Sequence, residues 1–189
     1  GYKVTLLPAN LAWLANYTED LQRRGIEVLH APFVLSPGQA LSERGAEFDA
    51  IYVTRYTVAQ QVLPLLREHA PKAKILFCNA DLHYLRELRA ARAEGLDGDA
   101  AERALEAVEQ VKRQELEVMV QVDLTLSYND VERGVIEAET LGQAATAPCP
   151  WVVEGPEQPQ PVQQRQGLAF LGSYNHPPNR VGVDSFLED

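Results

Sequence analysis

The chain has 189 residues, of which 46% are hydrophobic and 23% are charged, the balance of an ordinary globular protein. Its formal net charge of −10 argues against broad electrostatic binding of nucleic acid or of an anionic membrane. No apolar run approaches the roughly 18 residues that cross a bilayer. We therefore expect a cytoplasmic protein, in which Cys78 and Cys149 are reduced thiols.

Short β-branched or apolar runs alternate with helical periods along most of the chain. Strands are predicted at residues 3–8, 26–30, 49–54, 74–78, 122–127 and 150–153. Helices are predicted between them, near residues 11–24, 37–45, 57–69, 82–94, 100–121 and 130–141. Strands separated by helices form βαβ units with right-handed crossovers. The sequence therefore predicts a doubly wound α/β fold with a mostly parallel sheet.

Several polar residues carry the signals of helix starts. Asn10 is a plausible N-cap, and Ser36 precedes a proline at the first helical position. Thr57 and Asn129 each precede Gln or Glu by three residues, which is the spacing of a capping box. Asp81 is a further candidate cap.

The last part of the chain predicts a second, smaller segment. Residues 155–166 are rich in proline and glutamine, a composition typical of a solvated linker. A buried-strand pattern at 168–172, a polar loop and an apolar helix from Val181 to Leu187 follow. One strand and one helix cannot bury a core alone. We therefore expect a domain over 1–154, a linker over 155–166, and the start of a second domain over 167–189.

Residues just after the predicted strands are the candidates for a binding site, because ligands of open α/β sheets bind beyond the carboxyl ends of the strands. Asp81 and His83 place a carboxylate and an imidazole two residues apart, where a strand leads into a helix. There the helix dipole favours a neutral His83 that can share a hydrogen bond. The alternative interpretation is that Asp81 is a helix cap and His83 a surface residue.

Other candidates are cations and polar loops. Arg86 follows His83 by one turn and either faces an anionic ligand or pairs with a nearby acid. Arg55 is either an anion contact or the partner of Asp49 or Glu47. Residues 172–176 form a loop whose N–H groups could hold phosphate. The chain has no G-x-G-x-x-G motif, no P-loop motif and no metal-ligand spacing.

Three blocks of the sequence resemble bacterial family-4 glycosyltransferases of the two-Rossmann (GT-B) type. They are Asp81-Leu-His-Tyr-Leu-Arg-Glu-Leu-Arg89, Val122-Asp-Leu-Thr-Leu-Ser-Tyr-Asn-Asp-Val-Glu132 and Leu168-Ala-Phe-Leu-Gly-Ser-Tyr-Asn-His-Pro-Pro-Asn179. Their order and spacing match an acceptor-side domain, a linker and the first strand of a donor-side domain.

The resemblance implies transfer of a sugar from a nucleotide-sugar to a glycan or lipid-linked acceptor, with retention at the anomeric carbon. It implies no metal or other cofactor, because protein cations and helix dipoles stabilise the leaving diphosphate. The implied catalytic residues are His83 and Asp81. Asn10, Arg55 and Arg86 are the substrate-binding candidates, and Gly172, Ser173 and His176 are the candidates for the donor-phosphate loop.

The sequence departs from the family pattern at both ends. The first βα unit and most of the donor-side domain have no counterpart, so we expect the chain to be inactive alone. An uncovered sheet edge predicts a homodimer or a poorly soluble monomer, and parts outside the chain could contact a membrane. Two alternatives stay open at this point, a sugar-nucleotide epimerase of similar architecture and a non-catalytic α/β docking module.

Overall fold

The computed structural model describes residues 1–150, 152, 155 and 161–188. The chain divides into two compact units, Gly1–Trp151 and Val152–Asp189. The interpretation of the second unit as the start of a donor-side domain stays a prediction.

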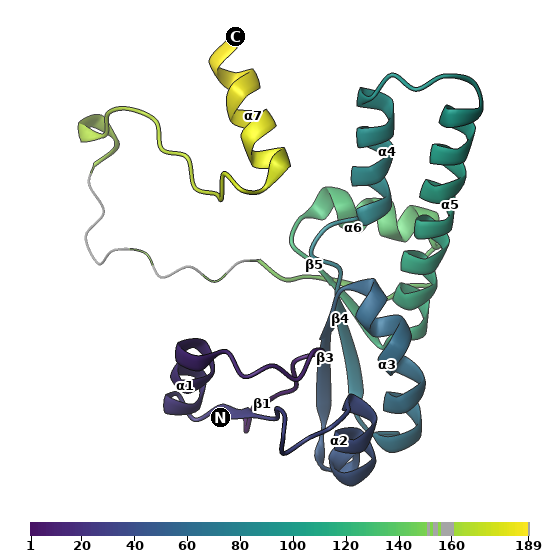
Figure 1. Cartoon of the computed structure of the whole chain (residues 1–189), viewed down its shortest axis with the longest axis vertical. Helices are drawn as coiled ribbons and strands as arrows, with labels where there is room; N and C mark the ends of the chain where they lie inside the picture. The colour runs from purple at the N-terminus through teal and green to yellow at the C-terminus, as the bar shows by residue number, and fades with distance from the viewer. Residues whose placement is uncertain (151, 153–154, 156–160, 189) are drawn as a thin grey trace. The chain divides into compact units, whose positions relative to one another are not determined.

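A four-stranded, all-parallel sheet is the centre of the first unit (Figure 1). Its strands lie in sequence order, β3 (Ala50–Thr54), β4 (Lys74–Cys78), β5 (Leu124–Ser127) and β6 (Thr146–Pro148). A second parallel pair joins β1 (Thr5–Leu6) to β2 (Glu27–Val28). Helices flank the larger sheet, and the predicted α/β, Rossmann-like fold is confirmed.

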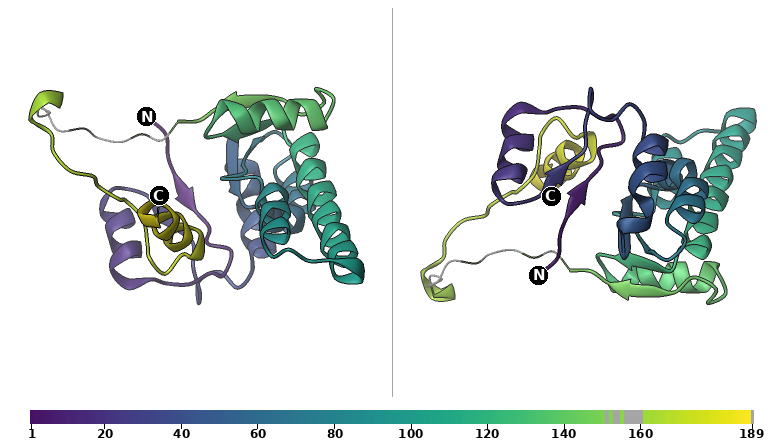
Figure 2. Two further views of the ribbon diagram at one scale, coloured as in Figure 1. Left: turned by 90° about the horizontal axis from the view of Figure 1, so that it is seen from above. Right: turned by 90° about the horizontal axis from the view of Figure 1, so that it is seen from below.

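Helices alternate with the strands, and two of them follow β4 in succession. The first unit contains α1 (Ala15–Arg23), α2 (Pro37–Arg44), α3 (Tyr56–His69), α4 (His83–Ala93), α5 (Gly98–Gln121) and α6 (Asp130–Glu139), with a 3₁₀ turn at Gly45–Glu47. The second unit contains a 3₁₀ turn at Val162–Gln164 and α7 (Pro177–Glu188). Each crossover from β3 to β6 moves in the same direction, so right-handed connections put their helices on one face of the sheet. Figure 2 shows α4 and α5 together on one side of it.

The core lies between that face and the helices. Ile75 and Phe77 alternate along β4 toward the helices and are completely buried. They pack in one cluster with Leu66 of α3, Met119 of α5 and Ile136 of α6. Alternation along a strand sends Tyr52 of β3 to the opposite face, where it is half exposed. The two faces of the sheet therefore differ in how well they are covered.

Two of the five candidate side-chain caps, Ser36 and Asn129, are confirmed. The Ser36 hydroxyl accepts a hydrogen bond from the N–H of Gln39, and the side-chain Oδ1 of Asn129 accepts one from the N–H of Glu132. The prediction of Thr57 as a cap is wrong, because α3 already begins at Tyr56 and the N-cap of this helix is Arg55. Asn10 was also wrong, because its side chain bonds the N–H of Ala12 in a local turn, and α1 begins only at Ala15.

Two predicted strands differ from the structure. The last strand of the first unit is Thr146–Pro148, and much of the run predicted at 150–153 lies outside the described residues. Residues 168–172 form no strand, and Leu171 is fully exposed. A strand needs a neighbour for its backbone hydrogen bonds, and the described part of the second unit contains no strand to supply one. The predicted helix that follows is present as α7.

Asp123 ties the amino ends of β4 and β5 to α3. Its carboxylate accepts the backbone N–H of Ile75 at 2.9 Å, Arg67 Nη1 at 3.1 Å and Lys74 Nζ at 3.3 Å. The hydrogen bond from the Ile75 N–H lowers the pKa of Asp123 most, and the bonds from Arg67 and Lys74 lower it further. This carboxylate therefore stabilises the register of the central strands.

We expect Asp123→Asn to lower the free energy of unfolding at pH 7 by roughly 1–3 kcal/mol, because hydrogen bonds to a charged acceptor are lost. The lowered pKa makes this contribution present above the ordinary value of about 3.8 and lost as pH falls through the folded-state value. Urea unfolding at pH 7 and pH 2 measures the difference. Glu106→Gln, an equal charge change at an exposed position of α5, is the control. A difference between wild type and Asp123→Asn that stays the same at both pH values would contradict this account.

Candidate functional site

Strained backbone marks the carboxyl ends of β3 and β4. Arg55, directly after β3, has φ of 68°, and Ala80, two residues after β4, has φ of 62°. Non-glycine residues adopt this left-handed region at a cost of order 1–3 kcal/mol, and they concentrate at functional sites. In an open parallel sheet this is also the end at which ligands bind. The two observations together place the candidate site here.

Asp81, His83 and Arg86 come together at this end of the sheet. Arg86 Nη1 forms an ion pair with the Asp81 carboxylate, and His83 Nδ1 lies 3.7 Å from Asp81 Oδ1. The Asp81–Arg86 pair is partly exposed, whereas only 15% of the His83 side chain is exposed. Of the two interpretations of Arg86, the structure shows the pairing with a nearby acid.

A second acidic residue, Glu115 of α5, holds the start of α4. Its Oε1 accepts the N–H of His83 at 3.0 Å and lies 2.9 Å from His83 Nδ1, and its Oε2 accepts the N–H of Tyr84 at 2.9 Å. Glu115 is completely buried. Its carboxylate fills the role of an N-cap from a different helix. The interpretation of Asp81 as the cap is wrong, because the N-cap position is Leu82 and no side chain of α4's own start supplies the bond.

The contact with Glu115 determines how the His83 ring is oriented. Burial raises the pKa of Glu115, while the N–H groups of Tyr84 and His83 act in the opposite direction. When the carboxylate is ionised, Nδ1 donates to it and Nε2 keeps its lone pair. A buried carboxylate on one imidazole nitrogen is the arrangement that orients a histidine for proton transfer at the other. The arrangement can therefore accept a hydrogen bond or a proton from a hydroxyl group.

Two further polar side chains follow β3 and β4 at this end of the sheet. The Tyr56 ring meets the His83 ring edge to face, with 5.2 Å between ring centroids, and burial raises the pKa of Tyr56. Asn79, at the end of β4, is 1% exposed, and its Nδ2 lies 3.5 Å from Glu132 Oε2. Its Oδ1 has no hydrogen-bond partner within the described part of the chain. A buried acceptor without a partner is uncommon in folded proteins.

Two other residues predicted for the site, Asn10 and Arg55, form no hydrogen bond or ion pair with His83 among the described residues. Asn10 follows β1, in the smaller sheet, and its side chain is used in its own turn. Arg55 is exposed and forms no ion pair with any described residue. Of its two suggested partners, Glu47 pairs with Arg44 instead, at 2.9 Å.

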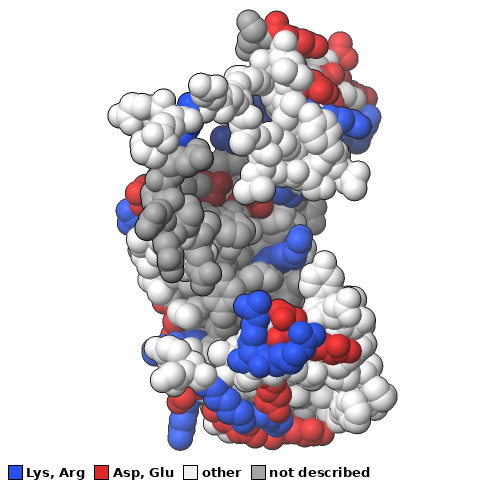
Figure 3. Space-filling view, turned by 90° about the vertical axis from the view of Figure 1, so that its left-hand side faces the viewer, with Lys and Arg blue, Asp and Glu red and all other residues white. Residues whose placement is uncertain are grey.

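Charged side chains of both signs are mixed on the face drawn in Figure 3, so the negative net charge forms no continuous acidic field there.

The predicted phosphate loop belongs to the second unit and is described by itself. The Ser173 carbonyl accepts a bond from Asn179 Nδ2 at 3.1 Å, and its hydroxyl accepts one from the N–H of Asn175. A Cβ at Gly172 would lie 2.7 Å from Asn179 Nδ2, so glycine is required for this close approach. His176 is exposed. The role of Gly172, Ser173 and His176 toward a donor phosphate stays a prediction.

Sequence reasoning missed Glu115, although the sequence contains a signal for it. Glu115 follows Val111 by four residues and precedes Val118 by three, so it lies on the apolar stripe of α5. A carboxylate on such a stripe must be paired or hydrogen-bonded when the helix packs. That constraint predicts a buried partner, but it does not say which element supplies it.

Other features of the described residues bear on what the site can hold. They contain no cluster of three or more His, Cys, Asp or Glu side chains arranged for a metal ion. None of the helices in the described ranges is long and apolar enough to cross a membrane. Cys78 and Cys149 are free thiols. Surface hollows line α5 and the groove between α5 and α6, and neither includes Asp81 or His83. We place the site by its chemistry, because those hollows are shallow and lie on helix surfaces.

Comparison with known proteins gives no relative, since no family model, no curated protein and no solved structure matches the chain.

We expect Glu115→Ala to lower the free energy of unfolding by about 3 kcal/mol, because two backbone N–H groups and the His83 ring lose a buried partner. Amide hydrogen exchange at His83 and Tyr84 should accelerate most, since these are the N–H groups that Glu115 accepts. Glu109→Ala, on an exposed position of the same helix, is the matched control. Exchange at the start of α4 that is equal in the two variants would show that Glu115 does not hold this helix.

Proposed function

We propose that this chain is the acceptor-side part of an enzyme that moves a sugar from a nucleotide-sugar to a glycan or lipid-linked acceptor, with retention at the anomeric carbon. The observation that carries the proposal is the His83–Glu115 pair at the carboxyl end of β4, in a Rossmann-like sheet. The three sequence blocks that resemble family-4 glycosyltransferases support the same class.

In this proposal His83 is the residue that touches the reacting sugar. Its Nδ1 is engaged by Glu115, so Nε2 is the atom that can accept a hydrogen bond from a sugar hydroxyl. Asp81 and Arg86 form a polar pair beside the ring and act as positioning residues for it. Their ion pair also balances the charge of the Asp81 carboxylate beside the ring.

Arg55 is the cation that we assign to the leaving diphosphate. It is exposed, it forms no ion pair within the described residues, and its strained backbone holds it at the end of β3. An arginine supplies a fixed fork of donors that suits phosphate oxygens. A positively charged group aimed at the leaving group stabilises the charge that develops during transfer. No metal ion or other cofactor is required in this proposal.

A second candidate is a docking module without catalytic activity. It is favoured by the large apolar side chains on and after α1, since Tyr17 and Phe33 are each 79% exposed and Leu35 is 75% exposed. An apolar surface of this kind binds other proteins more often than it binds sugars. The epimerase alternative would bind a nucleotide-sugar and need no acceptor.

Ligand titration followed by amide NMR distinguishes these candidates. A panel of nucleotide-sugars and neutral oligosaccharides is titrated into the wild-type chain, His83→Ala and His69→Ala. We expect at least one oligosaccharide to shift the amide signals of Arg55 and of residues 79–86. His83→Ala should weaken this binding by about tenfold, the effect of one lost hydrogen bond of average strength. His69 on α3 is the control, because its side chain lies on another element.

Each outcome of the titration separates one candidate from the others. Binding of nucleotide-sugars without any oligosaccharide would favour the epimerase. No shift with any sugar ligand, or equal affinity in His83→Ala and wild type, would contradict sugar transfer at this site and leave the docking module.

A further inference from the structure

The side-chain oxygen of Asn79 is a hydrogen-bond acceptor that the described part of the chain leaves unused. Asn79 directly follows β4 and is 1% exposed. Its Oδ1 is buried and has no hydrogen-bond partner among the described residues, while its Nδ2 lies 3.5 Å from Glu132 Oε2. A buried acceptor without a partner is costly, because water no longer solvates it. A bound group that donates a hydrogen bond to Oδ1 would remove this cost.

Glu132 offers a second acceptor beside this amide. It lies in the first turn of α6 and is partly exposed. Its carboxylate forms no ion pair within the described residues, and the neighbouring Arg133 pairs with Asp130 and Glu137 instead. An ionised carboxylate accepts hydrogen bonds at both of its oxygens. Apart from the contact with Asn79, this accepting capacity of Glu132 is free in the described part of the chain.

The parallel sheet puts this pair at the same end as His83. β4 and β5 are hydrogen-bonded neighbours, so the segments that follow them leave the sheet side by side. Asn79 follows β4 on the way to His83, and Glu132 lies in the helix that follows β5. Ala80, the residue after Asn79, is exposed. The Asn79 amide therefore lies just beneath the surface, next to a carboxylate that solvent reaches.

Both free positions are acceptors, so the group that they bind must donate hydrogen bonds. A hydroxyl group and an ammonium group both meet this requirement. The amino ends of α4 and α6 lie at this end of the sheet, and the positive ends of their dipoles disfavour a cation. A hydroxyl group avoids this conflict, and its oxygen can also accept a bond from the Asn79 amide. The arrangement therefore favours a neutral, hydroxylated ligand.

We propose that the Asn79 side-chain carbonyl and the Glu132 carboxylate bind two neighbouring hydroxyl groups on one ring of the acceptor sugar. This inference rests on the proposed function, and it names the part of the acceptor that the site recognises. Each oxygen accepts one hydroxyl proton in a hydrogen bond. The two acceptors belong to separate segments, the loop after β4 and the first turn of α6, so together they set the orientation of the sugar ring relative to His83.

Recognition by two acceptors predicts which sugars the site rejects. A sugar that lacks either hydroxyl group leaves one buried or half-buried acceptor without a partner. Sites built to bond a hydroxyl group discriminate strongly against analogues that lack it. Asn79 and Glu132 are thus specificity-determining residues, and His83 remains the residue assigned to the reacting sugar.

Sugars that lack one hydroxyl group test the assignment. The probes are the methyl glycosides of glucose, galactose and mannose, and the forms of each that lack a single ring hydroxyl. They are titrated into the wild-type chain while NMR records the side-chain NH₂ signals of Asn79. We expect at least one parent glycoside to bind and to shift these signals. Two of its deoxy forms, those that lack neighbouring hydroxyl groups, should each bind about tenfold more weakly, the effect of one lost hydrogen bond.

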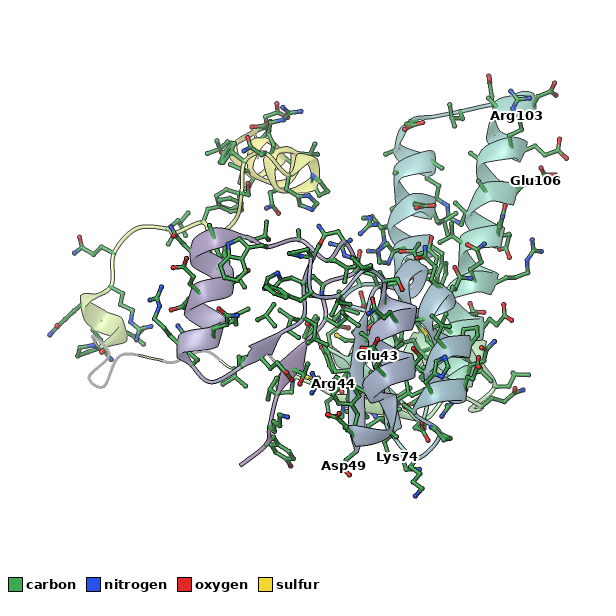
Figure 4. The ribbon with its side chains drawn as sticks, turned by 60° about the horizontal axis from the view of Figure 1, so that its bottom comes forward. Glu43, Arg44, Asp49, Lys74, Arg103 and Glu106 are labelled. Carbon is green, nitrogen blue, oxygen red and sulfur yellow. The ribbon has the colours of Figure 1, made fainter. Side chains whose placement is uncertain are left out.

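The Glu132→Gln variant assigns one of these hydroxyl groups to its partner. It should bind the parent glycoside about tenfold more weakly, because a carboxylate is a stronger acceptor than an amide. For one of the two deoxy forms the variant and wild type should bind equally, since the hydroxyl group that Glu132 accepts is already absent. Asp130→Asn is the matched control, because it makes the same charge change in the same turn of α6, on a side chain that is 79% exposed. Glu106→Gln, on an α5 side chain that points outward in Figure 4, controls for the loss of one negative charge elsewhere.

The same titrations distinguish this inference from the proposed function. Binding that weakens in His83→Ala but not in Glu132→Gln would overturn the hydroxyl pair and leave the proposed function standing. Binding that weakens in Glu132→Gln but not in His83→Ala would support the pair and contradict sugar transfer at His83. The inference also fails if no glycoside binds, or if every deoxy form binds as tightly as its parent. Tighter binding of methyl glucosaminide, in which an ammonium group replaces a hydroxyl group, than of methyl glucoside would overturn it as well.

Discussion

The buried carboxylate of Glu115 is the interaction on which the candidate site depends. A carboxylate with no exposed surface is costly to bury, and here two backbone N–H groups and Nδ1 of His83, all at the start of α4, offset that cost. Two of them are backbone groups that a helix start leaves without a partner. One side chain therefore joins α5 to α4, closes the end of α4 and orients the His83 ring. Position and chemistry are coupled, because the group that holds the helix also selects which imidazole nitrogen faces outward.

The parallel sheet determines where this group lies. Strands β3 to β6 follow one another in the same direction, so every crossover delivers a helix to one face and every loop to one end. The loops after β3 and β4 contain the strained residues Arg55 and Ala80, and α4 starts three residues after Ala80. The same winding leaves the edge of β3 and the face around Tyr52 less covered than the core at Phe77.

Much of the fold of the first unit could be predicted from the sequence, because local patterns determine it. The apolar runs of β3, β4 and β5 and the caps at Ser36 and Asn129 depend on neighbours within a few residues. Glu115 could not be assigned a role in this way, because its partners lie 31 and 32 residues earlier. The apolar run at 168–172 has strand character but no described neighbour to pair with. The proximity of Asp81 and His83 followed from their spacing, whereas the ring orientation needed the packing of two helices.

The ¹⁵N chemical shifts of the His83 ring test the central claim most directly, because they report which nitrogen carries the proton. Our account predicts a proton on Nδ1, bonded to Glu115, and an unprotonated Nε2 near neutral pH. In Glu115→Gln this preference should weaken, since the amide is a poorer acceptor than a carboxylate. A proton on Nε2 in the wild type, or shifts that do not change in Glu115→Gln, would contradict the claim that Glu115 orients His83 for chemistry at Nε2.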